Sequence, residues 1–253
     1  MLSAGADKIW AEDSGGPGDV LVLLHEGVGD ARMWDPVWSR LTSDHRVIRY
    51  DVRGFGRSAA ATEEFALLDD LRAVLAHFGV ETAHVVGCSM GGGTALEFAL
   101  AEPDRVKSLT LLCPGIGGYP YPATPELDEA CEALAEAGDD EGIIGLLLDV
   151  WARAGDDPLV TDLMQSAMQA WEGEEEFERE GEPTFDRLGD LRAPAVLMVG
   201  DLDDAALIAS NEEAATRIPG CALIRMPGVD HYPTVRAPGL VADTILRHVA
   251  ANS

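Results

Sequence analysis

Residues 84–101 read HVVGCSMGGGTALEFALA, and this stretch decides the fold. An apolar run from His84 to Val86 leads into the pattern G-x-S-x-G, and further glycines lead into a helical pattern over residues 95–101. A sharp turn from strand to helix strains the backbone at the serine, so glycines on either side give it room, and the turn exposes the serine hydroxyl. The stretch therefore predicts a strand, a turn that presents Ser89, and a helix. A glycine-rich turn with an incidental serine is the alternative.

Similar short apolar runs alternate with helical patterns along the whole chain, at Val20–Leu24, Arg46–Tyr50, His84–Cys88, Leu109–Cys113, Ala195–Gly200 and Ala222–Met226. Near-continuous hydrophobicity over about five residues is typical of strands buried on both faces of a parallel sheet. Lys8–Glu12 is expected to form an antiparallel edge strand, and Thr62 to cap a helix that ends before Gly79. The alternation predicts an α/β fold, a doubly wound and mostly parallel sheet that binds ligands at the carboxyl ends of its strands.

One segment, residues 119–188, interrupts the alternation and is predicted to be a helical lid inserted into a core formed by residues 1–118 and 189–253. It shows helical runs and no strand pattern, at 125–137, 143–151 and 158–171. The lid segment has twenty acidic and three basic side chains, a net charge of −17 out of −27 for the chain, and it contains the acidic run 172–182. This charge predicts either a solvated acidic face or a field that steers substrates.

The charge of the chain also argues against several classes of partner. Nucleic acid and anionic membrane surfaces are bound by clustered lysine and arginine, and this chain has 18 basic against 45 acidic side chains, with lysine only at Lys8 and Lys107. No apolar run approaches the ~18 residues of a membrane span, and the first residues lack a signal-peptide pattern. We therefore expect a soluble, cytoplasmic protein that acts on a small molecule. The sequence leaves the oligomeric state open.

The cysteines and histidines give no sign of a metal site or a cofactor. Four widely spaced cysteines form no C-x-x-C pair, so free thiols are expected, at Cys88, Cys113, Cys131 and Cys221. None of the six histidines has a partner at metal-ligand spacing. We therefore expect chemistry that needs neither a metal nor a cofactor.

A serine nucleophile needs a base, and the base needs an acid that orients it. His231 follows the last predicted strand in the loop PGVDHYP, where a base would lie at the strand ends, although a solvated loop histidine is the alternative. The acid is expected after the strand that ends at Gly200, in the sequence GDLDD. Asp203 is the first choice and Asp204 the alternative.

Backbone N–H groups are the expected donors to the oxyanion, each contributing on the order of 10²- to 10³-fold in rate. One donor is expected from Met90, the residue after the serine, and the other from Gly27 in the loop after the Val20–Leu24 strand. His25, at the start of this loop, is expected to brace it rather than to act as a base.

Together these features resemble the α/β-hydrolase superfamily over nearly the whole chain. Serine, acid and histidine occur in that superfamily's order, and the segments HEGVGDARMWDP (25–36) and VIRYDVRGFGRS (47–58) resemble the small-lid branch that includes 3-oxoadipate enol-lactonases and related esterases. In one departure, Glu26 separates the histidine and glycine that usually adjoin. In another, the substrate of the enol-lactonases is dianionic, and a lid segment of net charge −17 would repel it. The resemblance thus implies a serine hydrolase of an ester or lactone. The lid, whose only cations are Arg153, Arg179 and Arg187, offers no anion clamp and favours a neutral, moderately apolar substrate.

The lid is expected to supply part of the substrate pocket. An apolar stripe at helical spacing runs from Val160 to Trp171, and it either packs the lid onto the core or also lines the pocket. The predicted pocket residues are Trp34, Trp151, Met164, Met168 and Trp171. Hydrolysis of a C–C bond, cofactor-free peroxidase chemistry and a non-catalytic receptor that retains the triad are the alternative functions.

Overall fold

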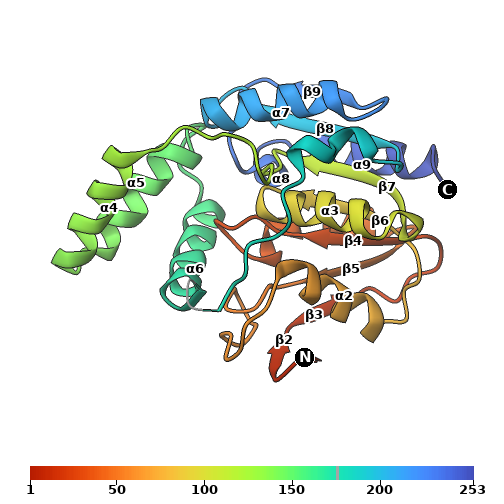
Figure 1. Cartoon of the computed structure of the whole chain (residues 1–253), viewed down its shortest axis with the longest axis horizontal. Coiled ribbons are helices and arrows are strands. Elements are labelled where there is room, and N and C mark those ends of the chain that lie inside the picture. The colour runs from red at the N-terminus through yellow and green to blue at the C-terminus, as the bar shows by residue number, and fades with distance from the viewer. Residues whose placement is uncertain (175–176) are drawn as a thin grey trace.

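The computed structural model describes residues 1–174 and 177–253; residues 175–176, within the acidic run of the lid segment, lie outside the described residues. A seven-stranded sheet forms the centre of the molecule (Figure 1), with all its strands parallel except the antiparallel edge strand β3. In spatial order the strands are β3 (Ala11–Asp13), β5 (Arg46–Tyr50), β4 (Val20–Leu24), β6 (Ala83–Cys88), β7 (Val106–Leu112), β8 (Ala195–Gly200) and β9 (Ala222–Met226). The predicted fold class is confirmed.

Helices cover both faces of this sheet (Figure 1). Every residue of β6 and of β8 is buried, which explains why these strands show continuous apolar runs without alternation. Three helices pack on one another, namely α1 (Asp35–Leu41), α8 (Pro233–Arg236) and α9 (Pro238–Ala250), whereas α2 (Leu67–His77) packs on α3 (Met90–Ala101) and α7 (Ala205–Arg217) on β8. The 3₁₀ helices are η1 (Ala31–Trp34), η2 (Pro103–Arg105) and η3 (Phe185–Asp190).

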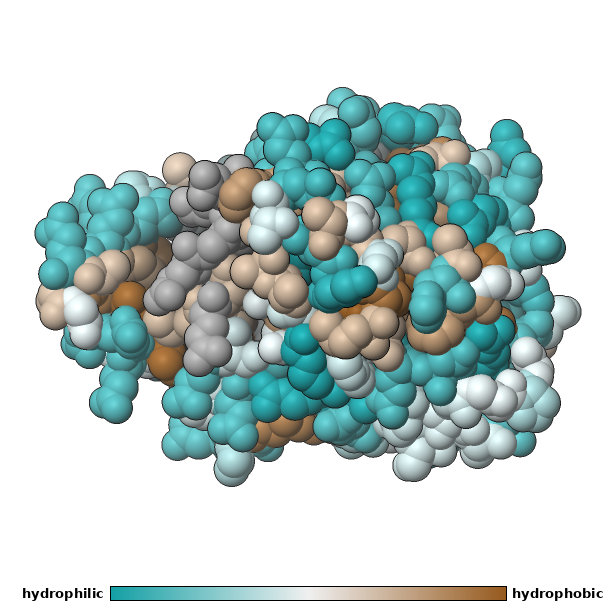
Figure 2. Space-filling view, turned by 90° about the horizontal axis from the view of Figure 1, so that it is seen from below, coloured by the Kyte–Doolittle hydropathy of each residue, from teal (hydrophilic) through white to brown (hydrophobic). Residues whose placement is uncertain are grey.

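The lid segment connects β7 to β8 through the helices α4 (Pro125–Ala137), α5 (Asp140–Trp151) and α6 (Pro158–Glu174). These helices coincide closely with the runs predicted from the sequence. The pair α4 and α5 extends away from the sheet, whereas α6 lies closer to it (Figure 1). In the space-filling view the projecting end on the left is mostly hydrophilic, with hydrophobic side chains among the polar ones (Figure 2). No helix in the part of the chain that the structure describes is long and apolar enough to cross a bilayer.

Two local predictions differ from the structure in their bounds, although an antiparallel edge strand, β3, is present. The expected edge strand over residues 8–12 is divided into β2 (Asp7–Ile9), which pairs with β1 (Leu2–Ala4), and β3. The division falls at Trp10, whose N–H donates to Ser58 Oγ at 2.9 Å. The helix expected to start at Thr62 begins at Leu67. The Thr62 hydroxyl donates to Asp7 Oδ1 at 2.6 Å, and the backbone of Phe65 is bonded to Phe177 and Arg179, so residues 62–65 are not helical.

Candidate active site

Ser89 lies on the turn between β6 and α3, with a φ of 49° and a ψ of −113°. This conformation is strained for a residue with a side chain. The flanking glycines are required, because a Cβ at Gly87 would lie 2.3 Å from the Gly91 oxygen and one at Gly91 would lie 2.5 Å from the Leu24 oxygen. The turn is held by backbone bonds of Ser89 and leaves its side chain partly exposed. The predicted strand, turn and helix are all present.

His231 and Asp203 form a buried pair beside this turn. His231 Nδ1 lies 2.9 Å and 3.0 Å from the two carboxylate oxygens of Asp203, and the side chains are 2% and 0% exposed. Burial by itself would lower the pKa of His231, but the adjacent Asp203 carboxylate outweighs it and raises that pKa well above its ordinary value. Asp204, the alternative acid, instead caps α7 by accepting hydrogen bonds from the N–H groups of Ala206 and Leu207.

Cys113, at the end of β7, lies next to both the serine turn and the histidine loop. Its Sγ is 3.6 Å from Cys88 Sγ and 3.9 Å from the His231 carbonyl oxygen. All four cysteines are free, as predicted. Ligand atoms of Cys113, Asp203 and His231 lie within 4.8 Å of one another, so these three are the described residues that could hold a metal ion. In the present arrangement Asp203 and His231 bond each other.

The loop after β4 places Gly27 next to Met90, since a Cβ on Gly27 would lie 3.5 Å from Met90 Sδ. His25 anchors the start of the loop: its carbonyl accepts from Gly91 N–H at 3.1 Å, and its Nε2 accepts from Val52 N–H at 3.0 Å. Nδ1 therefore holds the ring proton and donates to the Glu26 carbonyl at 2.7 Å. Burial lowers the pKa of His25, which is consistent with a neutral, bracing histidine.

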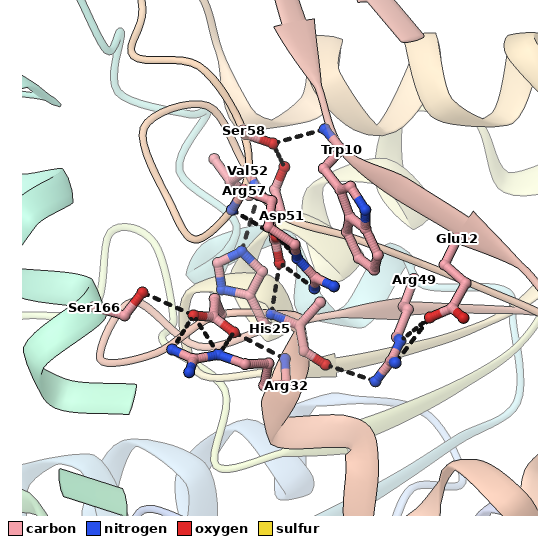
Figure 3. A network of polar contacts seen from close by, with 12 residues as sticks. Trp10, Glu12, His25, Arg32, Arg49, Asp51, Val52, Arg57, Ser58 and Ser166 are labelled. Carbon is pink, nitrogen blue, oxygen red and sulfur yellow. Dashed lines mark hydrogen bonds and ion pairs between the residues drawn. The ribbon is translucent and has the colours of Figure 1, made fainter. Parts of the chain in front are cut away.

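A network of ion pairs fixes the rest of this loop (Figure 3). Asp51 accepts from Ala31 N–H at 2.8 Å and from Arg57 Nε at 2.9 Å. Asp30, with a side chain only 1% exposed, pairs with Arg32 at 2.8 Å. The family-like segments 25–36 and 47–58 are thus two halves of one support for the loop.

Helix α6 lies over the same loop and is bonded to it at several positions along its length. The indole Nε1 of Trp171 donates to the Gly27 carbonyl at 3.0 Å, and Ser166 Oγ donates to Asp30 Oδ2 at 2.8 Å. Arg32 reaches the Asp162 carbonyl at 3.5 Å. The lid segment therefore contributes directly to the position of Gly27.

The five residues predicted to line one pocket do not lie together around one cavity. The Trp151 ring lies 4.5 Å from the His231 ring, and its carbonyl accepts from His231 N–H at 3.1 Å. Trp34 and Met164 are fully buried in the core, while Met168 and Trp171 are half-buried. A cavity of about 510 Å³ lies beside Met90, and none of the five predicted pocket residues is among the described residues that line it. Its lining includes the carboxylates of Glu97, Glu180 and Glu182.

The burial of Glu26 is not among the features predicted from the sequence. Its side chain is 0% exposed. The only signal in the sequence is the insertion of this residue between His25 and Gly27.

Comparisons with known proteins agree with this architecture. A family model described as the alpha/beta hydrolase fold matches residues 19–136. A provisionally named carbamate hydrolase, RutD, from Caulobacter sp. (strain K31) is 27% identical over 100% of both chains. The rhodomycin D methylesterase DauP of Streptomyces sp. (strain C5) is 27% identical over 99% of this chain and 98% of its own.

Among solved structures, the enol-lactonase from Burkholderia xenovorans LB400 superposes with a TM-score of 0.83 at 20% identity, over 99% of this chain and 100% of the other. At that identity the match establishes a common fold. The chain therefore has the α/β-hydrolase fold, and its resemblance to the α/β-hydrolase superfamily is confirmed.

Proposed function

We propose that the protein is a serine hydrolase that cleaves a carboxylic ester or lactone through an acyl-enzyme on Ser89. The observation that carries the proposal is the buried His231–Asp203 pair, 2.9 Å apart, at the same edge of the sheet as a serine with a φ of 49°. The similar proteins named as a methylesterase and a carbamate hydrolase support hydrolysis at a carbonyl carbon, and the methylesterase supports an ester in particular.

In the proposed mechanism, Ser89 Oγ attacks the carbonyl carbon and His231, in its neutral form, accepts the hydroxyl proton. Because Nδ1 is bonded to Asp203, the proton goes to Nε2, and Asp203 stabilises the imidazolium. The N–H groups of Met90 and Gly27 stabilise the oxyanion. His231 then returns the proton to the leaving oxygen, and a water molecule activated by His231 releases the acid and regenerates Ser89.

The substrate is proposed to be neutral and moderately apolar. The Trp151 ring beside His231 and the acidic residues that line the cavity beside Met90 (Glu97, Glu180 and Glu182) are unfavourable to an anionic substrate. A neutral aryl ester and a neutral lactone should therefore react faster than the corresponding dicarboxylates.

Labelling with a fluorophosphonate probe tests the nucleophile. Wild-type protein should be labelled and Ser89→Ala should not, although far-UV circular dichroism should show that the variant is folded. Ser43→Ala, at an exposed position remote from the turn, is the matched control and should label as wild type does. Labelling of Ser89→Ala would remove this serine from the mechanism, and ester turnover near background with tight ligand binding would indicate a receptor instead.

A further inference from the structure

The ring of Trp151 lies against the ring of His231, the proposed base. The two ring centroids are 4.5 Å apart, and the ring planes meet at 47°. The His231 side chain is 2% exposed, so its imidazole is largely shielded from water. The sequence predicts Trp151 in a substrate pocket, yet this residue is not among the described residues that line the cavity beside Met90. Its contact with the base therefore needs another explanation.

Trp151 is the last residue of α5, and the chain that follows it is bonded to the loop that carries His231. The Trp151 carbonyl accepts from His231 N–H at 3.1 Å. Ala154 N–H donates at 3.0 Å to a carboxylate oxygen of Asp230, whose side chain is 0% exposed. Arg236 of α8 pairs with the same carboxylate at 2.9 Å. These bonds hold the end of a lid helix on the base loop, so the indole is in place beside the imidazole before any substrate binds.

The imidazole of His231 becomes a cation in the proposed mechanism, when it takes the proton of Ser89. Asp203 is the negative partner of that cation at Nδ1, 2.9 Å away. The electron-rich face of an indole also attracts a cation within about 6 Å of its centroid, more strongly where water is excluded. The ring of Trp151, at 4.5 Å, lies within this range. A neutral imidazole has no net charge and is attracted less, so the indole favours the protonated base.

We propose that Trp151 stabilises the imidazolium form of His231 during acyl transfer, and that the lid segment contributes to the chemical step through this ring. The inference rests on the proposed function. The proton of Ser89 Oγ moves to His231 Nε2 while an electron pair of the oxygen forms the bond to the carbonyl carbon, and nothing is transferred to Trp151. Because the attraction is strongest when the imidazole is charged, it stabilises the transition state more than the bound substrate. Trp151 is thus a positioning residue that acts through the base.

The experiment replaces Trp151 with tryptophans that carry increasing numbers of fluorine atoms, inserted at this position alone by nonsense suppression. Fluorine withdraws electron density from the indole face and leaves the shape of the ring nearly unchanged. With a neutral p-nitrophenyl ester, log kcat should fall with each added fluorine, by about tenfold over the series, while KM changes little. Acylation and deacylation both form the imidazolium, so the expected fall is the same whichever step limits kcat.

Natural side chains at the same position give a second measure. Trp151→Phe should retain more of kcat than Trp151→Leu, because a benzene face attracts a cation less than an indole face does and an aliphatic side chain has no such face. KM should again change little in both variants. If Trp151→Leu does not fold, the fluorine series decides alone, since it preserves the shape of the ring.

The same fluorine series at Trp38 is the matched control. Trp38, on α1, also lies beside a cation, since its ring centroid is 4.2 Å from the guanidinium carbon of Arg49. That cation takes no part in the proposed proton transfer. Fluorination of Trp38 should therefore leave both kcat and KM unchanged.

Two results would overturn the inference. A kcat that stays constant along the series at Trp151 would mean that the ring only fills space. A KM that rises with fluorine content while kcat stays constant would mean that the indole binds the substrate instead of the base.

Failure of the inference and failure of the proposed function give different results. If Ser89→Ala is unlabelled and inactive while kcat is constant along the series at Trp151, only the role of Trp151 is wrong. If Ser89→Ala turns over the ester at the wild-type rate, the serine mechanism is wrong, and the proposal for Trp151 is overturned with it.

Discussion

Asp203 and Asp204 are neighbours with different partners, which gives a prediction about two adjacent carboxylates. Asp203 bonds His231 Nδ1 at 2.9 Å, whereas Asp204 caps α7. We expect Asp203→Asn to lose about 10⁴-fold in kcat while the fold persists, because the amide favours the wrong imidazole tautomer. Asp204→Ala should retain kcat and lose about 1 kcal/mol of stability, as for a lost N-cap. Ester kinetics and urea denaturation of both variants check this, and the reverse pattern would contradict it.

Glu26 gives a prediction about stability. Burial raises the pKa of its carboxyl group from the ordinary value of 4.5 to about 8 in the folded protein. The unfolded chain ionises this group first, so the wild type loses stability as pH rises from about 4.5 to about 8. Glu26→Gln has no such loss. Its melting temperature relative to wild type should therefore rise between pH 4.5 and 8, and scanning calorimetry at several pH values measures this. A constant difference would mean that Glu26 ionises normally.

Individual residues show where prediction from sequence stops. The order of serine, acid and histidine predicted Ser89 and His231, and both lie at the expected strand ends. It did not decide between Asp203 and Asp204 as the acid, because that choice depends on the directions in which the turn after β8 points two consecutive side chains. The enclosure of Glu26 was not predictable, since it depends on the packing of Leu163 and Gly29, which are remote from each other in the sequence.

At the scale of elements, the contact between α6 and the loop after β4 predicts that a helix of the lid segment positions an oxyanion donor. Trp171→Phe keeps the ring face but loses the N–H that bonds the Gly27 carbonyl. One such bond contributes ~1 kcal/mol, so kcat should fall about fivefold with KM little changed. Trp34→Phe is the matched control, because the Trp34 N–H has no partner among the described residues. It should change stability but not kcat; equal effects on kcat would argue against the contact.

The elements predicted best are those whose burial is uniform. Strands such as β6 and β8 are buried along their whole length, so their apolar runs identify them without knowledge of the neighbours. The strand expected over residues 8–12 fails because a distant hydroxyl, that of Ser58, bonds the backbone at its centre. The predicted N-cap at Thr62 is wrong for the same reason, since the Thr62 hydroxyl donates its hydrogen bond to Asp7, 55 positions away in the chain. Both errors come from long-range hydrogen bonds.

At the scale of the whole molecule, two groups of carboxyls predict greatest stability at mildly acidic pH. Hydrogen bonds from Lys107 hold the pKa of Asp19 at about 2, so its contribution is lost as pH falls below 3.8. Burial raises the pKa of Asp70 to about 6 and that of Glu26 to about 8, so their contributions are lost as pH rises through those values. Self-repulsion of a chain of net charge −27 adds to the loss at high pH.

Urea denaturation from pH 2.5 to 9 measures this dependence. The free energy of unfolding should be greatest near pH 4 and should fall on both sides, because the loss from Asp19 begins below 3.8 and the losses from Asp70 and Glu26 begin above 3.8 and 4.5. At pH 8 added salt should raise it by screening the repulsion between surface carboxylates. A steady rise from pH 4 to 8 would contradict the balance proposed here.

Helix α4 adds no buried side chain to the protein and packs on α5, whose last residue is Trp151 beside His231. We therefore expect most substitutions on α4 to leave folding intact, and those that face α5 to act through α5 on the surroundings of His231. Neutral substitutions are therefore expected to accumulate in this helix, because few of them would be removed by selection against misfolding.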